Sequence, residues 1–185
     1  MRQSVVLARH PDGDGTEVEK IEATVSWNGG GSIALSYTIR GELSRLRFPP
    51  HLPPRQSDRL WEHTCFEAFV AIKDQSSYYE FNFAPSGEWA VYAFRAYREA
   101  AALPIEPTAP KIAARSAGDR FELAATIAIA RLLPIRPGAR LSVALSAVIE
   151  DNRGMLSYWA LNHPPGKPDF HHRDSFVLEI EAPDR

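Results

Sequence analysis

The sequence is poor in cysteine and in long apolar runs. Among its 185 residues only Cys65 is a cysteine, which excludes an intramolecular disulfide and a zinc finger built on cysteine ligands. The apolar run near the N-terminus, Val5 to Ala8, is too short for the hydrophobic part of a signal peptide or for a membrane span. We therefore expect a cytoplasmic protein with no membrane partner.

The sequence also lacks an excess of either charge. Lys and Arg number 21 against 23 Asp and Glu, so the formal net charge is −2. Without a basic surplus we expect no nucleic-acid partner. The apolar share of 44% and the charged share of 24% are typical of a globular protein, and the length predicts one domain over residues 1–185. The 15 prolines argue against a helical bundle.

Familiar catalytic motifs are missing as well. The sequence contains no GxGxxG, GxxxxGK[ST], CxxC, HExxH or GxSxG pattern. Nucleotide-binding, zinc-protease and nucleophile-elbow functions therefore lose their usual sequence support. Cys65 stands next to Phe66 in an apolar run, which is typical of a small buried residue rather than a nucleophile. We expect no cofactor and favour a binding protein over an enzyme.

What the sequence does contain is alternation of apolar and polar residues with a period of two. Ile21 to Trp27 and Ile33 to Arg40 alternate in this way, and Asn28 to Gly31 between them predicts a hairpin turn. The same pattern predicts strands at Phe66–Ile72, Tyr78–Phe83, Trp89–Phe94, Phe121–Ile129, Leu141–Ile149, Leu156–Leu161 and Phe176–Ile180. Short helical turns are expected only at Ala96–Leu103 and Ala128–Leu133. Such spacing predicts an all-β fold, a two-sheet β-sandwich of the immunoglobulin-like or jelly-roll type.

One group of polar and aromatic residues falls on one predicted sheet face. Trp61, His63 and Glu67 occupy alternate positions, so they point to the same side of an extended chain. Glu80 and Asn82 lie on the non-core face of the next predicted strand. If the two strands are neighbours, these carboxylates and the amide share a face. Because sugar hydroxyls need donors and acceptors and sugar C–H groups pack on aromatic rings, the group predicts a sugar-like ligand.

A second group lies in the Pro- and Gly-containing loop between Tyr158 and Arg173. Its histidines His163 and His171 are candidate ligand contacts, because loops often carry functional residues. For Trp89 and Trp159 the sequence leaves two interpretations open, a place in the core or a platform for the ligand.

Two alternatives belong to other classes of function. One is a metal-dependent enzyme in which His63, His163 and His171 hold the metal and Glu67 is the general base. These residues match no standard spacing of metal ligands, so we expect no bound metal. The other alternative is a haem-binding electron carrier with two histidine ligands, since the two methionines form no clear Met/His axial pair.

Three segments together resemble the DOMON-like domains related to carbohydrate-binding module family 9. They are Leu60–Phe69, Tyr79–Trp89 and Tyr158–His172. The likeness extends from about Trp27 to Leu178, nearly the whole chain.

The resemblance implies a two-sheet β-sandwich with a ligand pocket on one concave sheet, and ligands of either sugar or haem type. At the matching positions it implies aromatic walls near Trp61 and Trp159 and polar contacts from Glu67 and Asn82. We therefore predict a non-catalytic β-sandwich that binds a small, carbohydrate-like molecule. The sequence leaves the sugar and the oligomeric state open.

Overall fold

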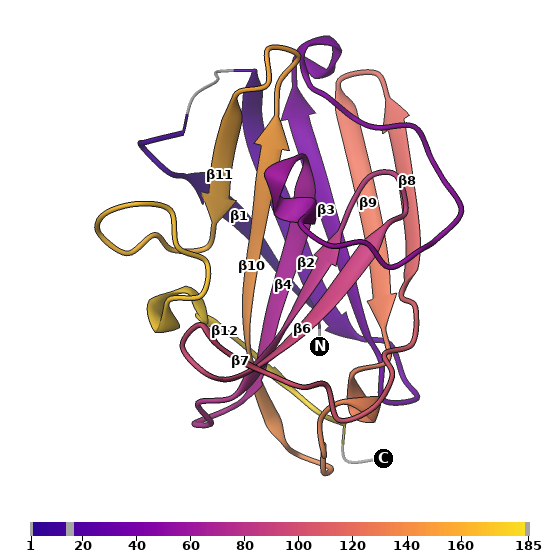
Figure 1. Ribbon diagram of the computed structural model, residues 1–185, viewed down its shortest axis with the longest axis vertical. Helices are drawn as coiled ribbons and strands as arrows, with labels where there is room; N and C mark the ends of the chain where they lie inside the picture. Colours follow the sequence, from indigo (N-terminus) through magenta and orange to yellow (C-terminus); the bar gives the residue numbers. More distant parts are fainter. Residues whose placement is uncertain (1, 14–16, 184–185) are drawn as a thin grey trace.

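The computed structural model describes residues 2–13 and 17–183, which form strands joined by loops and short 3-10 turns (Figure 1). The strands are β1 (Arg2–Arg9), β2 (Val18–Trp27), β3 (Ile33–Gly41), β4 (Cys65–Ile72), β5 (Tyr78–Phe83), β6 (Trp89–Ala96), β7 (Glu99–Ala101), β8 (Lys111–Ala117), β9 (Arg120–Ile127), β10 (Arg140–Glu150), β11 (Leu156–Ala160) and β12 (Leu178–Glu181). The 3-10 turns are η1 (Leu43–Arg45), η2 (Leu60–Glu62), η3 (Ile129–Arg131) and η4 (Arg173–Ser175). Within the described ranges, no helix is long and apolar enough to cross a membrane.

The strands form two antiparallel sheets that are connected through β1. The first sheet has the order β1-β2-β3-β9-β8, and the second has the order β7-β6-β5-β4-β10-β11, with β12 pairing to β10. Strand β1 belongs to both, because residues 2–7 pair with β2 whereas Ala8 and Arg9 pair with β11. Figure 1 shows the second sheet, with β10 and β4, in front of β1, β2 and β3. The all-β, two-sheet sandwich is confirmed.

The main hydrophobic core fills the space between the two sheets. Tyr37 of β3 packs on Phe66 of β4 with ring centroids 5.1 Å apart, and Phe121 of β9 stacks on Phe66 at 5.9 Å. The hydroxyl of Tyr37 donates a hydrogen bond of 2.7 Å to the main-chain carbonyl of Glu67. Burial of large side chains is worth roughly 1.5–3 kcal/mol each, so these contacts hold the layers together.

Strand β4 is buried on both faces. One set of alternate residues, Phe66, Ala68 and Val70, enters the main core. The opposite set is buried too, and consists of Cys65, Glu67, Phe69 and Ala71. The turn η2 and the loop between β11 and β12 cover this outer face, with Leu60 packing near Cys65 and Phe176 near Phe69. A carboxylate on this strand is therefore buried although it points away from the core.

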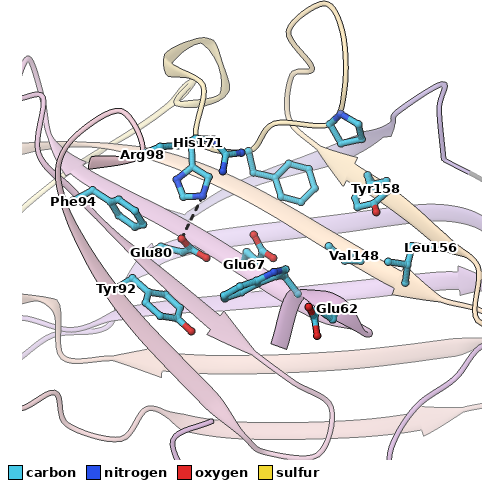
Figure 2. Close-up of a pocket in the computed structure, with 13 residues that line it drawn as sticks. Glu62, Glu67, Glu80, Tyr92, Phe94, Arg98, Val148, Leu156, Tyr158 and His171 are labelled. Carbon is cyan, nitrogen blue, oxygen red and sulfur yellow. Dashed lines mark ion pairs between the residues drawn. The ribbon is translucent and has the colours of Figure 1, made fainter. Parts of the chain in front are cut away.

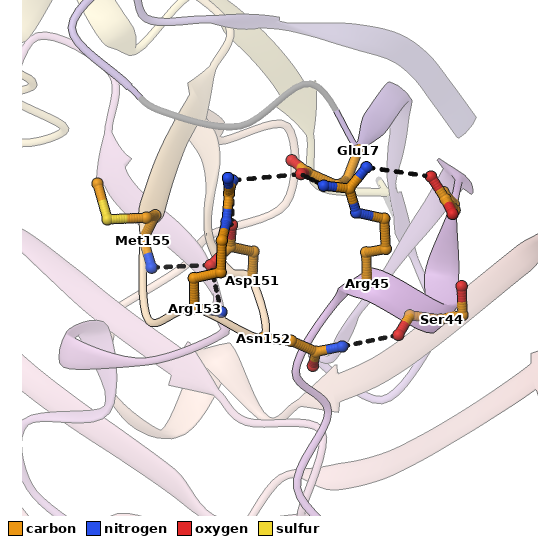
Figure 3. Close-up of polar contacts among 8 residues, drawn as sticks. Glu17, Ser44, Arg45, Asp151, Asn152, Arg153 and Met155 are labelled. Carbon is orange, nitrogen blue, oxygen red and sulfur yellow. Dashed lines mark hydrogen bonds and ion pairs between the residues drawn. The ribbon is translucent and has the colours of Figure 1, made fainter.

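A polar network joins three connections at the margin of the sandwich (Figure 3). The carboxylate of Glu17, whose side chain is 4% exposed, forms ion pairs with Arg45 at 3.1 Å and with Arg153 at 3.3 Å. The side-chain amide of Asn152 donates to the carbonyl of Ser44 at 2.7 Å. The network links the start of β2, the turn after β3 and the turn after β10.

The predicted strands all appear in the structure, the last of them beginning at Leu178. The helical turn expected at Ala128–Leu133 is present as η3. The prediction of a helical turn at Ala96–Leu103 is wrong, because this segment forms the β6–β7 hairpin. There Arg98 adopts the left-handed backbone conformation, with φ of 53°, and the chain reverses within two residues. Strands β1, β7 and β8 were not anticipated, because their exposed faces weaken the alternation.

Replacing Tyr37 by Phe tests the contact between the layers. The variant removes the buried hydroxyl and leaves the Glu67 carbonyl without that donor, so the free energy of unfolding should fall by about 1–3 kcal/mol. Urea denaturation measures the change. Tyr79→Phe is the matched control, because its hydroxyl donates to the Leu132 carbonyl at 3.1 Å from a half-buried position and should cost less. Equal stability of Tyr37→Phe and wild type would contradict the role of this bond.

Candidate functional site

The principal pocket lies on the outer face of the second sheet and has a volume of about 590 Å³ (Figure 2). Strands β4, β5, β6, β10 and β11 contribute its floor and sides, and η2 and the loop between β11 and β12 form its rim. The lining residues are Trp61, Glu62, Glu67, Glu80, Tyr92, Phe94, Arg98, Val148, Leu156, Tyr158, Pro168, Phe170 and His171. A cavity of this size, with mixed aromatic and carboxylate lining, is suited to a small organic ligand.

The base of the pocket is a row of polar side chains across three neighbouring strands. Glu67 of β4 lies opposite Asn82 of β5 on one side and opposite Ser146 of β10 on the other. Glu80, two residues before Asn82, points to the same face. The pairing confirms that the strands of Glu67 and Asn82 are neighbours, so that these side chains share a face as the sequence predicted.

Several polar atoms of this row have no hydrogen-bond partner among the described residues. They are Oε1 of Glu67, Oδ1 of Asn82 and Oγ of Ser146, all of which are buried. The amide nitrogen of Asn82, in contrast, donates to Oε1 of Glu80 at 2.8 Å. Buried polar atoms usually have partners, so three such atoms under one pocket indicate that a ligand or water completes the set.

Burial controls the protonation of the two carboxyl groups. Glu67 and Glu80 are 3% and 5% exposed. Desolvation raises the pKa of Glu67 well above its usual range, the nearby charge of Glu80 raises this pKa further, and Arg98 partly opposes the shift. Desolvation likewise raises the pKa of Glu80 to about 7, against the lowering effects of the Asn82 hydrogen bond and Arg98. The pair therefore holds a proton at neutral pH.

His171 lies over these carboxylates and is uncharged at neutral pH. Burial lowers the pKa of His171 to about 4, and the charge of Arg98 acts in the same direction. The Tyr78 hydroxyl accepts from the Arg98 main-chain N–H at 3.1 Å and lies 2.9 Å from Nδ1 of His171. The tyrosine can thus donate to Nδ1, which leaves the imidazole proton on Nε2, 3.5 Å from Glu80 (Figure 2). The contact between Nε2 and Glu80 orients the imidazole ring of His171, but it is not an ion pair because the ring is uncharged.

Aromatic rings from three parts of the chain form the walls. Trp61 of η2 is 39% exposed and meets Tyr92 of β6 edge to face at 5.7 Å. Phe94, two residues further along β6, lies 5.0 Å from the His171 ring. Tyr158 lies on the side of the pocket opposite Tyr92 and Phe94 (Figure 2), and the Phe170 ring is 6.3 Å from it. The pocket therefore offers flat apolar surfaces above a polar base.

The structure brings together four of the residues proposed from sequence and places the others elsewhere. Trp61, Glu67, Glu80 and His171 line the pocket, and Asn82 lies beneath it through its bond to Glu80.

Of the others, Trp89 and Trp159 lie in the main core, because Trp89 pairs with Phe83 and Trp159 with Ala147, both inward-facing residues. His63 bonds to Glu150 at 2.8 Å beside a different cavity. His163 bonds to the Ala8 carbonyl at 2.8 Å.

The metal and haem alternatives find no support in this arrangement. His63, His163 and His171 have different partners and do not converge. No group of three or more His, Cys, Asp or Glu side chains with metal-binding geometry occurs in the part of the chain that the structure describes. His63 also does not line the pocket that contains His171.

Several pocket residues were not found from the sequence. Tyr92 and Phe94 lie opposite Glu80 and Tyr78 in the β5–β6 hairpin, so they share the pocket face. The Pro85–Gly87 turn fixes this register, and the alternation in β6 could have identified both aromatics. Arg98 and Phe170 carried no such signal, because a hairpin reversal and an irregular loop position them.

Comparison with known proteins identifies the fold but no sequence family. No protein-family model matches the sequence, and no curated protein sequence is significantly similar to it. Among solved structures, a candidate carbohydrate-binding protein from Bacteroides uniformis has a TM-score of 0.69 and 16% identity, over 98% of this chain and 86% of that one.

A carbohydrate-binding module of family 9 from Caldicellulosiruptor kristjanssonii, in complex with cellotriose, has a TM-score of 0.60 and 12% identity over 99% of this chain and 83% of that one. A structure of a family 9 module from the same organism in complex with glucose has a TM-score of 0.57 and 12% identity, over 93% and 80%. The chain therefore has a β-sandwich fold like that of carbohydrate-binding modules.

The raised pKa of Glu80 predicts a specific pH dependence. A carboxyl group whose pKa rises from 4.5 to about 7 on folding binds its proton more tightly in the native state, so its ionisation costs stability as the pH rises through this range. Glu80→Gln cannot ionise. Its free energy of unfolding, relative to wild type, should increase by roughly 1–3 kcal/mol between about pH 5 and pH 8 in urea denaturation.

Glu179→Gln is the control for this experiment. Glu179 is exposed on β12, and a hydrogen bond from Lys73 lowers its pKa, so it is ionised in both states across this range. Its difference from wild type should stay constant with pH. A constant difference for Glu80→Gln as well would show that Glu80 is ionised in the native protein at pH 5.

Proposed function

We propose that this chain is a non-catalytic, DOMON-like domain that binds a carbohydrate-like small molecule in the pocket between η2 and the loop that joins β11 to β12. The observation that carries the proposal is the group of buried polar atoms under the pocket without partners among the described residues. Hydroxyl groups of a sugar can donate to the carboxyl oxygens of Glu67, which lines the pocket, and can accept from this carboxyl group when it is protonated.

The walls suit the other surface of a sugar. The C–H face of a pyranose packs on flat rings, and Trp61, Tyr92 and Tyr158 present such rings along the pocket. The fold likeness supports the same conclusion, because two of the similar structures are carbohydrate-binding modules in complex with cellotriose and glucose. We infer the sugar ligand from the site, with the fold as added support.

Replacement of Trp61 by Ala tests whether the aromatic wall of the pocket contributes to sugar binding. Trp61 is partly exposed and packs on Tyr92 at the rim, so the variant should fold while sugar affinity falls about tenfold to a hundredfold through lost stacking. Calorimetric titration of a panel of mono- and disaccharides into wild type identifies the best ligand for the comparison. Ile105→Ala, which also removes an exposed apolar side chain but lies outside the pocket, should bind like wild type.

Replacement of Glu67 by Gln tests whether the carboxyl group at the bottom of the pocket forms hydrogen bonds with the sugar. The shape is kept while one acceptor oxygen becomes a donor amide, so the affinity for the same sugar should fall about tenfold to a hundredfold. If both variants bound the best sugar as tightly as wild type, the site would lie elsewhere on the protein. If wild type bound no sugar of the panel, the proposed function itself would be refuted.

A further inference from the structure

The carboxylates at the base of the pocket lack a neutralising partner. Glu67 and Glu80 are both nearly inaccessible to bulk water. Among the pocket-lining residues that the structure describes, Arg98 is the only Lys or Arg, and its guanidinium pairs with Asp169 at 2.8 Å. His171 is uncharged at neutral pH because burial lowers its pKa to about 4. If both carboxyl groups ionise, their charge has to be balanced by a ligand.

A second, independent observation concerns hydrogen bonds rather than charge. Oε1 of Glu67, which lines the pocket, and Oδ1 of Asn82, which lies beneath it, are buried and have no hydrogen-bond partner among the described residues. Oε2 of Glu80 makes a long contact with His171, at 3.5 Å. The base therefore needs a ligand that brings several donors, and an ammonium group brings three and no acceptor.

The walls favour a cation as well. Tyr92 and Phe94 lie beside Glu80 (Figure 2), and Trp61, which also lines the pocket, meets Tyr92 edge to face. The face of an aromatic ring attracts a cation, most strongly where water is excluded. Aromatic walls over buried carboxylates are thus complementary to an organic cation, whereas a neutral sugar gains no electrostatic attraction from the ring faces.

We propose that the ligand of this pocket is an amino sugar, whose primary ammonium group lies against the carboxylates of Glu67 and Glu80 while its ring packs on the aromatic wall. This inference rests on the proposed function and names its ligand class. The spacing is suitable, because Glu67 and Glu80 are diagonal neighbours on antiparallel strands, with backbones about 7–8 Å apart. An ammonium group that donates two charge-assisted bonds of about 2.8 Å at the tetrahedral angle spans acceptors about 4.5 Å apart, a separation that the two side chains can reach from these backbone positions.

Binding of an amino sugar must change the protonation of the pocket. Without ligand the Glu67–Glu80 pair holds a proton, because desolvation raises the pKa of both groups. The ammonium group favours the ionised pair, so it expels that proton into solution. A neutral sugar has no such effect. Six other titratable or charged groups interact with the pair, namely Tyr37, Cys65, Tyr78, Tyr92, Arg98 and His171. Glu62 and Tyr158 also line the pocket.

None of those six groups changes its charge near neutral pH. Burial raises the pKa of Cys65 well above its usual value and raises the pKa of the three tyrosines as well, so all four stay protonated. Arg98 stays charged, and His171 is already neutral there. A proton released on binding between about pH 6 and pH 7.5 therefore comes from the carboxyl pair.

The experiment compares sugars that share a ring and differ in charge. Glucose, its 2-amino, 3-amino and 6-amino derivatives and the N-acetylated form of each are titrated into wild-type protein by calorimetry near pH 7. At least one amino derivative should bind ten- to a hundredfold more tightly than glucose and than its own N-acetylated form. Repeating the titration in phosphate and in HEPES, which differ in ionisation enthalpy and carry no primary ammonium group, should show proton release for that derivative only.

Two variants and a matched control test whether the preference for amino sugars and the proton release arise from Glu67 and Glu80. Glu67→Gln and Glu80→Gln should reduce the ratio of amino-sugar to glucose affinity to about one and abolish proton release. Glu179→Gln is the control, because Glu179 is an exposed carboxylate on β12 that does not line the pocket. It should keep both the ratio and the proton release. If a Glu67 variant does not fold, the proton release of wild type still tests the proposal.

The outcomes separate this inference from the proposed function. Tight binding of glucose without preference for any amino derivative would overturn the amino-sugar inference and leave a neutral-sugar pocket. Binding of methylammonium or spermidine without binding of any sugar would overturn both statements and leave a site for simple amines. Absence of binding by every ligand of the panel would also refute both.

Discussion

The burial of strands β4 and β5 on both faces is the constraint on which the rest of the structure depends. Their inner residues, such as Phe66, hold the two sheets together, and their outer residues are covered by η2 and the loop between β11 and β12. A carboxylate on the outer face then cannot remain in water. Glu67 and Glu80 consequently have raised pKa values and stand at the base of a pocket instead of on a solvated surface.

The base and the rim of the pocket differ in how they are built. The base is set by strand register, since Glu67 is opposite Asn82 and Ser146 in adjacent ladders, and such positions vary little. The rim depends on single contacts: the Arg98–Asp169 ion pair attaches the loop to the β6–β7 hairpin, and the Tyr78–His171 hydrogen bond attaches it to β5. Recognition of the ligand's polar groups therefore rests on rigid elements, and adjustment to ligand size can come from the loop.

Sequence alone predicted the features that depend on periodicity and missed those that depend on tertiary placement. Alternation identified the sandwich, the β4 and β5 strands and the shared face of Glu67 and Asn82. The same alternation, carried through the β5–β6 hairpin, separates Trp89 in the core from Tyr92 in the pocket. It could not find Arg98 or show that His63 and His163 bond to other parts of the chain, because an irregular turn and long-range contacts decide these positions.

Under the proposed function, the buried polar row couples the stability of this protein to ligand binding. In the absence of ligand, the native state contains acceptor oxygens without partners among the described residues, and a carboxyl pair that cannot ionise freely. Each such group costs free energy that a well-packed apolar residue would not. A ligand that supplies donors and charge removes this cost on binding, so its affinity includes the relief of an unfavourable native state. The polar row therefore weakens the free protein in the same place where it makes binding selective.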